Sequence, residues 1–167
     1  MARYIRTYPD PALKTTAKPV EAINQEVKDL AQEMADLMYA NQGIGLAAPQ
    51  VGEASCVIAV DVSGPERRED LQILINPVIE SALGETETDE GCLSLPEFRT
   101  KVQRAEQVTV TGLDLNGQEV RIQCEGLQAI CFQHEIDHLN GKLLIDHAGR
   151  LKRNLYCKKA HKWEKKN

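Results

Sequence analysis

Residues 134–138 read His134-Glu135-Ile136-Asp137-His138, which is the pattern His-Glu-x-x-His. Residues four apart share one face of a helix, so two imidazoles can bind one metal ion with the glutamate beside them. A metal ion makes bound water more acidic, and a neighbouring carboxylate can accept its proton. The pattern therefore predicts a hydrolytic metal site. The alternative is a pair of core histidines that hydrogen-bond to the backbone.

A catalytic metal needs a third protein ligand and an open position for water. We favour Cys92, because its segment Glu90-Gly91-Cys92-Leu93-Ser94-Leu95-Pro96 has the glycine and proline of a loop or strand end that could face the helix. Cys131 competes, but it lies one turn before His134 on the same helix, where we expect it to pack or to line a pocket. A single cysteine is also often just a small buried apolar residue.

A third segment reads Gly43-Ile44-Gly45-Leu46-Ala47-Ala48-Pro49-Gln50. Its two glycines permit close approach of another backbone or a ligand, and the Gln50 amide is a donor that needs a partner. Taken alone, the segment is more typical of a tight connection from a helix to a strand than of a binding site.

Together the three segments resemble the peptide deformylase family. The signatures of that family are a glycine-rich loop ending in glutamine, a Glu-Gly-Cys-Leu-Ser segment, and Gln-His-Glu-x-Asp-His on a helix; all three occur here in the same order. The resemblance covers essentially the full length and implies the compact bacterial form. It also implies the activity: metal-dependent hydrolysis of the N-formyl group from formylmethionine at the start of newly made polypeptides, with release of formate.

The resemblance implies a role for each matching residue. The implied metal ligands are Cys92, His134 and His138. Glu135 is then the general base that later protonates the leaving amine. Gln50 and the backbone N–H of Leu93 are the implied donors to the formyl oxygen. The implied ion is iron(II) in cells, and zinc, nickel or cobalt can occupy the same site of two nitrogens and one sulfur.

Substrate contacts follow in the same way. Leu127 and Ile130 lie within two turns before the first histidine and are placed to line an apolar slot for the methionine side chain. In the family the peptide backbone lies along the glycine-rich loop as an added strand, which implies contacts with Ile44, Gly45 and Gly91.

Two charged residues have weaker assignments. Arg99 matches a family position near the substrate. Asp137 is expected to orient a ligand or to pair with a base such as Arg104. Either residue is also compatible with an ordinary ion pair.

Apolar periodicity predicts the elements that must position these groups. A helix is expected from about Asn24 to Tyr39, and strands at Cys56–Asp61 and Leu71–Ile75, with a polar loop between the strands. Asn116-Gly117 separates two further strand patterns and predicts an antiparallel hairpin. All of these strands precede the histidine helix in the sequence.

The histidine helix is expected from Gly126 to Asn140, with Gly141 as its left-handed cap. It has apolar residues on two faces and is therefore expected to be buried among strands. Leu151, Leu155 and Cys157 form a weak apolar stripe that predicts a loosely docked C-terminal helix. The expected fold class is α+β, with antiparallel β-sheets around a central metal-binding helix and outer N-terminal and C-terminal helices.

Composition sets outer limits on the function. A chain of 167 residues predicts one catalytic domain, residues 1–167. No apolar run suits a membrane span, and the N-terminus lacks an apolar signal core. Five cysteines without tight spacing suit a reducing compartment, so we expect a cytoplasmic protein without a membrane partner.

Charge is distributed unevenly along the chain. Residues 148–167 carry eight Lys and Arg against one acid, which leaves 12 bases and 24 acids elsewhere, a net charge of −12. An acidic body makes DNA an improbable partner. The basic C-terminal helix is either a solvated surface or a contact with the ribosome, near the emerging formylated nascent peptides.

Two rival functions make different predictions. A zinc endopeptidase built on the same helix would cleave internal peptide bonds and would not need Cys92. A structural metal site would be closed by a fourth ligand such as Cys124 or Cys131, and it would leave Glu135 and Gln50 without a task.

Overall fold

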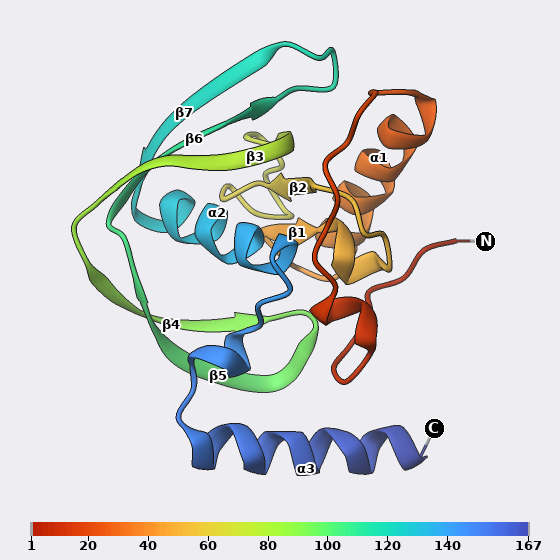
Figure 1. Ribbon diagram of the computed structural model, residues 1–167, viewed down its shortest axis with the longest axis vertical. Coiled ribbons are helices and arrows are strands. Elements are labelled where there is room, and N and C mark those ends of the chain that lie inside the picture. The colour runs from red at the N-terminus through yellow and green to blue at the C-terminus, as the bar shows by residue number, and fades with distance from the viewer. Residues whose placement is uncertain (1, 167) are drawn as a thin grey trace.

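The computed structural model describes residues 2–166 (Figure 1). In chain order the elements are the 3-10 helix η1 (Pro11–Lys14), α1 (Gln25–Ala40), β1 (Gly45–Ala47), the 3-10 helix η2 (Ala48–Val51), β2 (Val57–Val60), β3 (Gln72–Leu83), β4 (Thr86–Cys92), β5 (Leu95–Arg104), β6 (Gln107–Leu113), β7 (Glu119–Glu125), α2 (Gly126–Leu139), the 3-10 helix η3 (Leu144–His147) and α3 (Arg150–Lys166).

The strands form two antiparallel sheets. One has the order β1-β2-β3-β6-β7, and the other is the β4-β5 hairpin. Only two residues separate β3 from β4, and only two separate β5 from β6. One long antiparallel ribbon therefore bends and continues from the first sheet into the second, as the left side of Figure 1 shows. Gly84 lies at this bend with a φ of 74°, a conformation that favours glycine.

Helix α1 packs on one face of the five-stranded sheet. Asn24 caps it, because its side-chain oxygen accepts a hydrogen bond from the Val27 amide at 3.1 Å. The buried face of the helix includes Leu30, Met34 and Met38, which lie against Val57 and Ala59 of β2. This packing fixes where α1 ends, and therefore where the glycine-rich segment begins.

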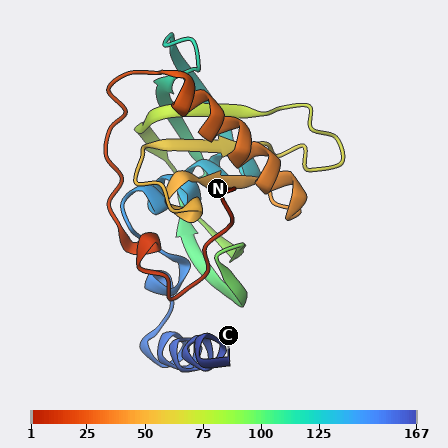
Figure 2. The ribbon, with the colours of Figure 1, turned by 90° about the vertical axis from the view of Figure 1, so that its right-hand side faces the viewer.

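Helix α2 lies on the other face of the same sheet, with the β4-β5 hairpin on its far side (Figures 1 and 2). Phe132 and Ala129 are fully buried and pack with Ile58 and Val60, the strand residues that alternate with those facing α1. The Gln133 side chain bonds both the N–H and the carbonyl of Ala105, at 2.9 and 3.0 Å. The helix is thereby attached to the bend of the ribbon.

The α+β fold class and the central helix between antiparallel strands are confirmed. The expected helix at Asn24–Tyr39 is α1, the Asn116-Gly117 hairpin joins β6 to β7, and Gly141 has a φ of 71° after α2. Two predictions fell short. The strand expected at Leu71–Ile75 continues to Leu83, and the β4-β5 hairpin was not predicted beyond a possible strand end near Cys92.

The predicted contact face of α3 was wrong for its two leucines, whereas Cys157 does contact the body, with its Sγ 3.1 Å from the Tyr8 hydroxyl. Leu151 and Leu155 are 74% and 59% exposed. The helix packs instead through Tyr156, Ala160 and Trp163, which recur at spacings of four and three on a neighbouring face. Tyr156 contacts the Phe98 ring with centroids 4.8 Å apart, and its hydroxyl donates to the Pro96 carbonyl at 2.9 Å. Aromatic side chains bury more area than the two leucines could, so they select the docked face.

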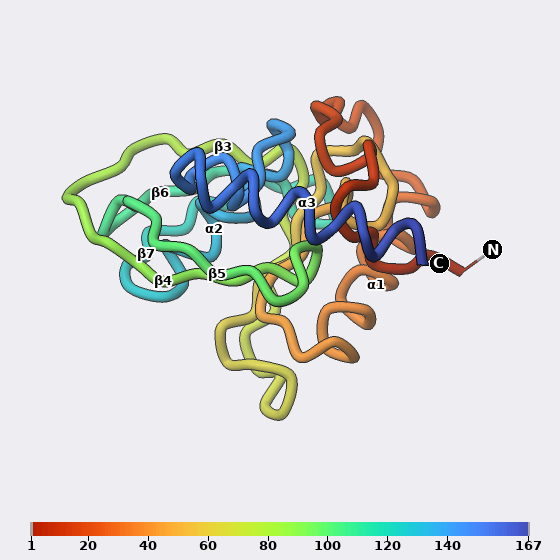
Figure 3. The backbone as a smooth tube through the Cα atoms, turned by 90° about the horizontal axis from the view of Figure 1, so that it is seen from below, coloured from red at the N-terminus to blue at the C-terminus, as the bar shows by residue number. Residues whose placement is uncertain are grey.

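Figure 3 shows α3 running across the lower side of the molecule. Within residues 2–166, none of the helices combines the length and the apolar character needed to cross a membrane.

Gly141 provides a test of how α2 is terminated. An added Cβ there would lie 2.6 Å from the Lys14 carbonyl oxygen. Gly117 has a similar φ of 80°, but its Cβ would meet only an Ile23 methyl at 3.9 Å. We expect Gly117→Ala to lower the free energy of unfolding by about 1–2 kcal/mol through backbone strain alone. Gly141→Ala should cost roughly 3 kcal/mol, because a backbone carbonyl must also shift. Urea denaturation measures both, and equal losses would contradict the close contact.

Candidate metal centre and active site

Three ligand-type atoms from two elements meet at the end of β4. Cys92 Sγ lies 3.4 Å from His138 Nε2, which lies 3.2 Å from His134 Nε2. All three atoms lie within 4.8 Å of one another, and residues 2–166 contain no other such group. A tetrahedral ion at ordinary bond lengths separates nitrogen and sulfur ligands by roughly 3.3–3.6 Å. The cluster therefore fits a divalent metal ion with two nitrogen donors and one sulfur donor.

The orientation of His134 is set by Glu90. His134 Nδ1 lies 3.0 Å from Glu90 Oε1, so Nδ1 donates there and Nε2 faces the cluster. Glu90 also accepts two N–H groups of the buried Arg104, at 2.9 and 2.8 Å. Burial alone would raise the pKa of Glu90, but the hydrogen bonds from Arg104, His134 and Thr88 outweigh it and hold the pKa well below its usual range. A buried, ionised carboxylate thus holds the imidazole in place.

The pKa values of the two imidazoles are shifted in opposite directions. Burial alone would lower the pKa of His134, but its hydrogen bonds to Cys92 and Glu90 raise that pKa well above the usual value. Burial lowers the pKa of His138 well below the usual value, so this ring is neutral. Metal ions bind the neutral form of histidine, so metal affinity at such a cluster depends on pH.

Asp137 extends the network behind the cluster. Arg104 Nη1 donates to Asp137 Oδ2 at 2.7 Å, and His147 Nε2 lies 3.1 Å from the same oxygen. The expected pairing of Asp137 with Arg104 is present. It is not a surface ion pair, because Arg104 is only 6% exposed.

Glu135 lies in the pocket beside the cluster and is 4% exposed. Its Oε2 has no hydrogen-bond partner, and burial raises the pKa of the carboxyl group to about 7. An added Cβ at Gly45 would lie 2.5 Å from Glu135 Oε1 and 2.7 Å from Cys131 Sγ, so only glycine leaves room for both side chains. A carboxyl group with these properties can accept a proton and return it near neutral pH.

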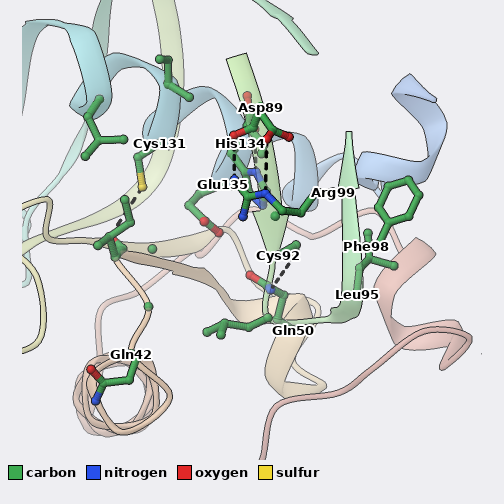
Figure 4. Close-up of a pocket in the computed structure, with 18 of the residues that line it drawn as sticks. Gln42, Gln50, Asp89, Cys92, Leu95, Phe98, Arg99, Cys131, His134 and Glu135 are labelled. Carbon is green, nitrogen blue, oxygen red and sulfur yellow. Dashed lines mark hydrogen bonds and ion pairs between the residues drawn. The ribbon is translucent and has the colours of Figure 1, made fainter. Parts of the chain in front are cut away.

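Gln50 approaches Cys92 from the side opposite to His134 (Figure 4). Its Oε1 accepts the Ala47 amide at 2.9 Å. Its Nε2 donates to Ser94 Oγ at 3.0 Å and lies 3.6 Å from Cys92 Sγ. Leu93 lies in the turn between β4 and β5 and packs against Gly43, where an added Cβ would lie 2.8 Å from Leu93 Cδ1.

A pocket of about 660 Å³ opens in front of these groups. The predicted site residues that line it are Gln50, Cys92, Leu93, His134, Glu135, Ile44, Gly45, Gly91, Arg99, Leu127 and Ile130. His138 lies behind the lining and is 1% exposed. Leu127 is 55% exposed, and Cys131 is buried in the wall, as its sequence position suggested. The structure therefore brings all the predicted site residues to one place.

One wall of the pocket is the open edge of the five-stranded sheet. β1 is the edge strand, and the Asp61 amide donates to the Ile44 carbonyl at 2.8 Å. In an antiparallel pair, hydrogen-bonded positions alternate with non-bonded positions. Gly45, opposite Val60, therefore directs its N–H and carbonyl away from β2. The edge can accept an extended chain as an added strand.

Sequence reasoning missed two residues. Glu90 was quoted only as part of a motif, although an acid beside a candidate ligand is a signal for a partner of a metal-binding histidine. Ser94 gave no signal, because its contact with Gln50 depends on tertiary structure. The fourth ligands of the structural alternative do not join the cluster: Cys124 and Cys131 donate to the Val108 and Ile44 carbonyls.

Comparisons with known proteins agree on one family. A family model described as polypeptide deformylase matches residues 2–154. A peptide deformylase of Thermodesulfovibrio yellowstonii is 50% identical over 93% of this chain and 94% of its own. One from Desulfosudis oleivorans is 47% identical over 95% of this chain and 92% of its own.

Solved structures give the same result. A peptide deformylase from Legionella pneumophila superposes with a TM-score of 0.91 at 42% identity, covering 99% of this chain and 96% of that one. A peptide deformylase from Synechococcus elongatus in complex with actinonin gives 0.87 at 39% identity, covering 94% and 86%.

Metal content tests the cluster. We expect the wild-type protein to bind one divalent ion per chain. Cys92→Ala and His138→Ala should each weaken binding by at least about 100-fold, because losing even an outer partner of a ligand costs about 10–100-fold. Cobalt(II) loading should give a thiolate charge-transfer band that Cys92→Ala lacks. Cys131→Ala is the matched control, since this thiol lines the same pocket but bonds the Ile44 carbonyl. A band that persists without Cys92 would exclude the thiolate ligand.

Proposed function

The chain belongs to the peptide deformylase family, and from this premise we propose how its own residues carry out the reaction. The enzyme removes the formyl group from the N-terminal formylmethionine of nascent peptides and releases formate. The observation that carries the residue assignment is the partnerless carboxylate oxygen of Glu135, in a pocket beside three converging metal-ligand atoms.

Cys92, His134 and His138 are the proposed metal ligands. When bound, a divalent ion makes a coordinated water more acidic and polarises a carbonyl oxygen. The ionised Glu90 keeps His134 turned toward the ion. We propose iron(II) as the native metal, as the family resemblance implies. A site of two nitrogens and one sulfur also suits zinc, nickel or cobalt, and metal analysis of anaerobically purified protein would identify the ion.

Glu135 is the proposed general base and general acid. It takes a proton from the attacking water as the new C–O bond forms at the formyl carbon. It then delivers that proton to the amine nitrogen as the C–N bond breaks. Its buried position and its pKa of about 7 suit both transfers.

Gln50 and Leu93 are the proposed donors to the formyl oxygen. Negative charge builds on this oxygen during attack, and each preorganised N–H that faces it lowers the barrier by a few kcal/mol, or about 10²–10³ in rate. The amide of Gln50 is well suited because two hydrogen bonds hold it and it is only 2% exposed.

The substrate backbone is proposed to lie along β1 as an added strand. The outward N–H and carbonyl of Gly45 support this placement, with Ile44 beside them and Gly91 across the pocket. Leu127 and Ile130 are the proposed walls of the methionine slot. The Arg99 guanidinium lies above Gly91, where an added Cβ would be 2.8 Å from its Nη1, and can donate to a peptide carbonyl.

The cellular location and the domain organisation of the enzyme are also proposed. We propose a cytoplasmic enzyme whose whole chain forms one catalytic domain. Its five cysteines are free, which suits a reducing compartment. The packing of α3 against β5 through Tyr156 supports a single unit.

Formate release from a formyl-Met peptide tests the role of Glu135. We expect Glu135→Ala to keep its metal and to lose at least about 100-fold in kcat, because no other group replaces the proton carrier. Glu85→Ala, which changes an exposed acid, serves as the control. An N-acetylated peptide of the same sequence should remain uncleaved at internal bonds. Full turnover by Glu135→Ala would remove the assignment, and internal cleavage would favour the endopeptidase.

We also propose that α3 contacts the ribosome. The helix packs through Tyr156, Ala160 and Trp163, which leaves Lys158, Lys162 and Lys165 exposed. Cationic side chains on one exposed helix match a phosphate-rich surface.

Reversing these charges tests the ribosome contact. Lys158→Glu, Lys162→Glu and Lys165→Glu together should weaken binding to purified ribosomes about tenfold or more at moderate salt. Hydrolysis of short formylated peptides should not change. A triple variant of Lys18, Lys28 and Lys101 to Glu changes the net charge equally at other exposed positions and is the control. Equal weakening by both triples, or by neither, would rule out a specific contact through α3.

A further inference from the structure

Ser94 is fully buried in the turn that joins β4 to β5. It lies two residues after the proposed ligand Cys92 and directly after the proposed donor Leu93. Its hydroxyl oxygen accepts Gln50 Nε2 at 3.0 Å, and its backbone carbonyl accepts the Tyr8 amide at 2.8 Å. Both its main chain and its side chain therefore have defined partners.

The planar amide of Gln50 has one oxygen and two N–H groups to place. The Ala47 amide holds the oxygen, at 2.9 Å. Ser94 Oγ accepts one N–H. The nearest partner of the other N–H is Cys92 Sγ, at the long distance of 3.6 Å. Ser94 thus leaves one N–H of Gln50 without an oxygen acceptor and directs it toward the metal-ligand cluster.

The backbone sets the separation of these two residues. The Arg6 amide donates to the Gln50 carbonyl at 2.7 Å, and the Tyr8 amide donates to the Ser94 carbonyl. Alternate residues of one N-terminal segment therefore hold the main chains of both residues. Because these bonds fix the main chains, removing the Ser94 hydroxyl should change the side-chain contact with little movement of the backbone.

We propose that Ser94 is a positioning residue for the deformylation reaction, acting through Gln50. The inference rests on the proposed role of Gln50 as a donor to the formyl oxygen. The last torsion of a glutamine side chain has a broad energy profile, so an amide held at one end only can rotate. The serine hydroxyl limits this rotation and keeps the free N–H aimed at the position where negative charge develops.

A double-mutant cycle on kcat distinguishes positioning from a structural role. We expect Ser94→Ala to lower kcat about tenfold, the effect of one lost hydrogen bond of average strength, with little change in KM. Gln50→Ala should lower kcat about 10²–10³-fold. In the Gln50→Ala background, adding Ser94→Ala should change kcat less than about twofold, because the group that Ser94 positions is absent. Metal content and thermal midpoint are measured for all four proteins.

The outcomes separate the two levels of the proposal. An equal loss from Ser94→Ala in both backgrounds, or no loss in the wild-type background, overturns the positioning role and leaves the role of Gln50 intact. An undiminished kcat in Gln50→Ala overturns the donor role itself. If Ser94→Ala fails to fold or loses its metal, Ser94→Cys replaces it. Sulfur has nearly the same shape but is a weak acceptor, so the same pattern is expected.

Discussion

The buried carboxylate of Glu90 is the constraint on which the site depends. It lies two residues before Cys92 and joins three separate elements: its own strand β4, Arg104 at the end of β5, and His134 on α2. A buried charge without partners is very costly, and removing one partner of such a pair typically costs about 3–5 kcal/mol. Glu90 is therefore stable only when β5 and α2 are both in place. The same contacts that stabilise this carboxylate bring the sulfur and the imidazoles together.

The bend in the β-ribbon makes this arrangement possible. A flat continuation of β3 into β4 would leave α2 covered on one side only. Because both strands of the ribbon change direction at the same bend, one at Gly84 and the other at Ala105, the hairpin reaches the far side of the helix (Figure 1). Gln133 bonds both backbone groups of Ala105, so the residue directly before His134 fixes the bend relative to the helix. The same contacts therefore determine the position of the bend and the position of the candidate metal ligands.

Much of the site was predictable because it depends on residues that are close together in the sequence. Two histidines four apart on a helix, glycines that allow close approach, and the Asn116-Gly117 turn all act within a few residues. The β4-β5 hairpin was missed because its inward residues are not uniformly apolar: Thr100 and Arg104 alternate with Phe98 and Val102. The contact face of α3 was misjudged for a related reason. Local periodicity selected Leu151 and Leu155, whereas the docked face is chosen by the aromatic partners Phe98 and Tyr8, which are distant in sequence.

The buried polar atoms that lack hydrogen-bond partners lower the stability of the protein, and most of them lie at the candidate site. Nearly all buried polar groups in proteins have partners, and one without a partner costs about 1–3 kcal/mol. In residues 2–166 only three buried side-chain atoms lack a partner, and two of them, Glu135 Oε2 and His138 Nδ1, belong to the site. A fully satisfied Glu135 would be more stable, but its oxygen would not be free for the proposed transfer of a proton from water. The surrounding contacts of Glu90, Gln50 and Ser94 hold that costly arrangement in place, so the precision of the site comes from residues that do not themselves react.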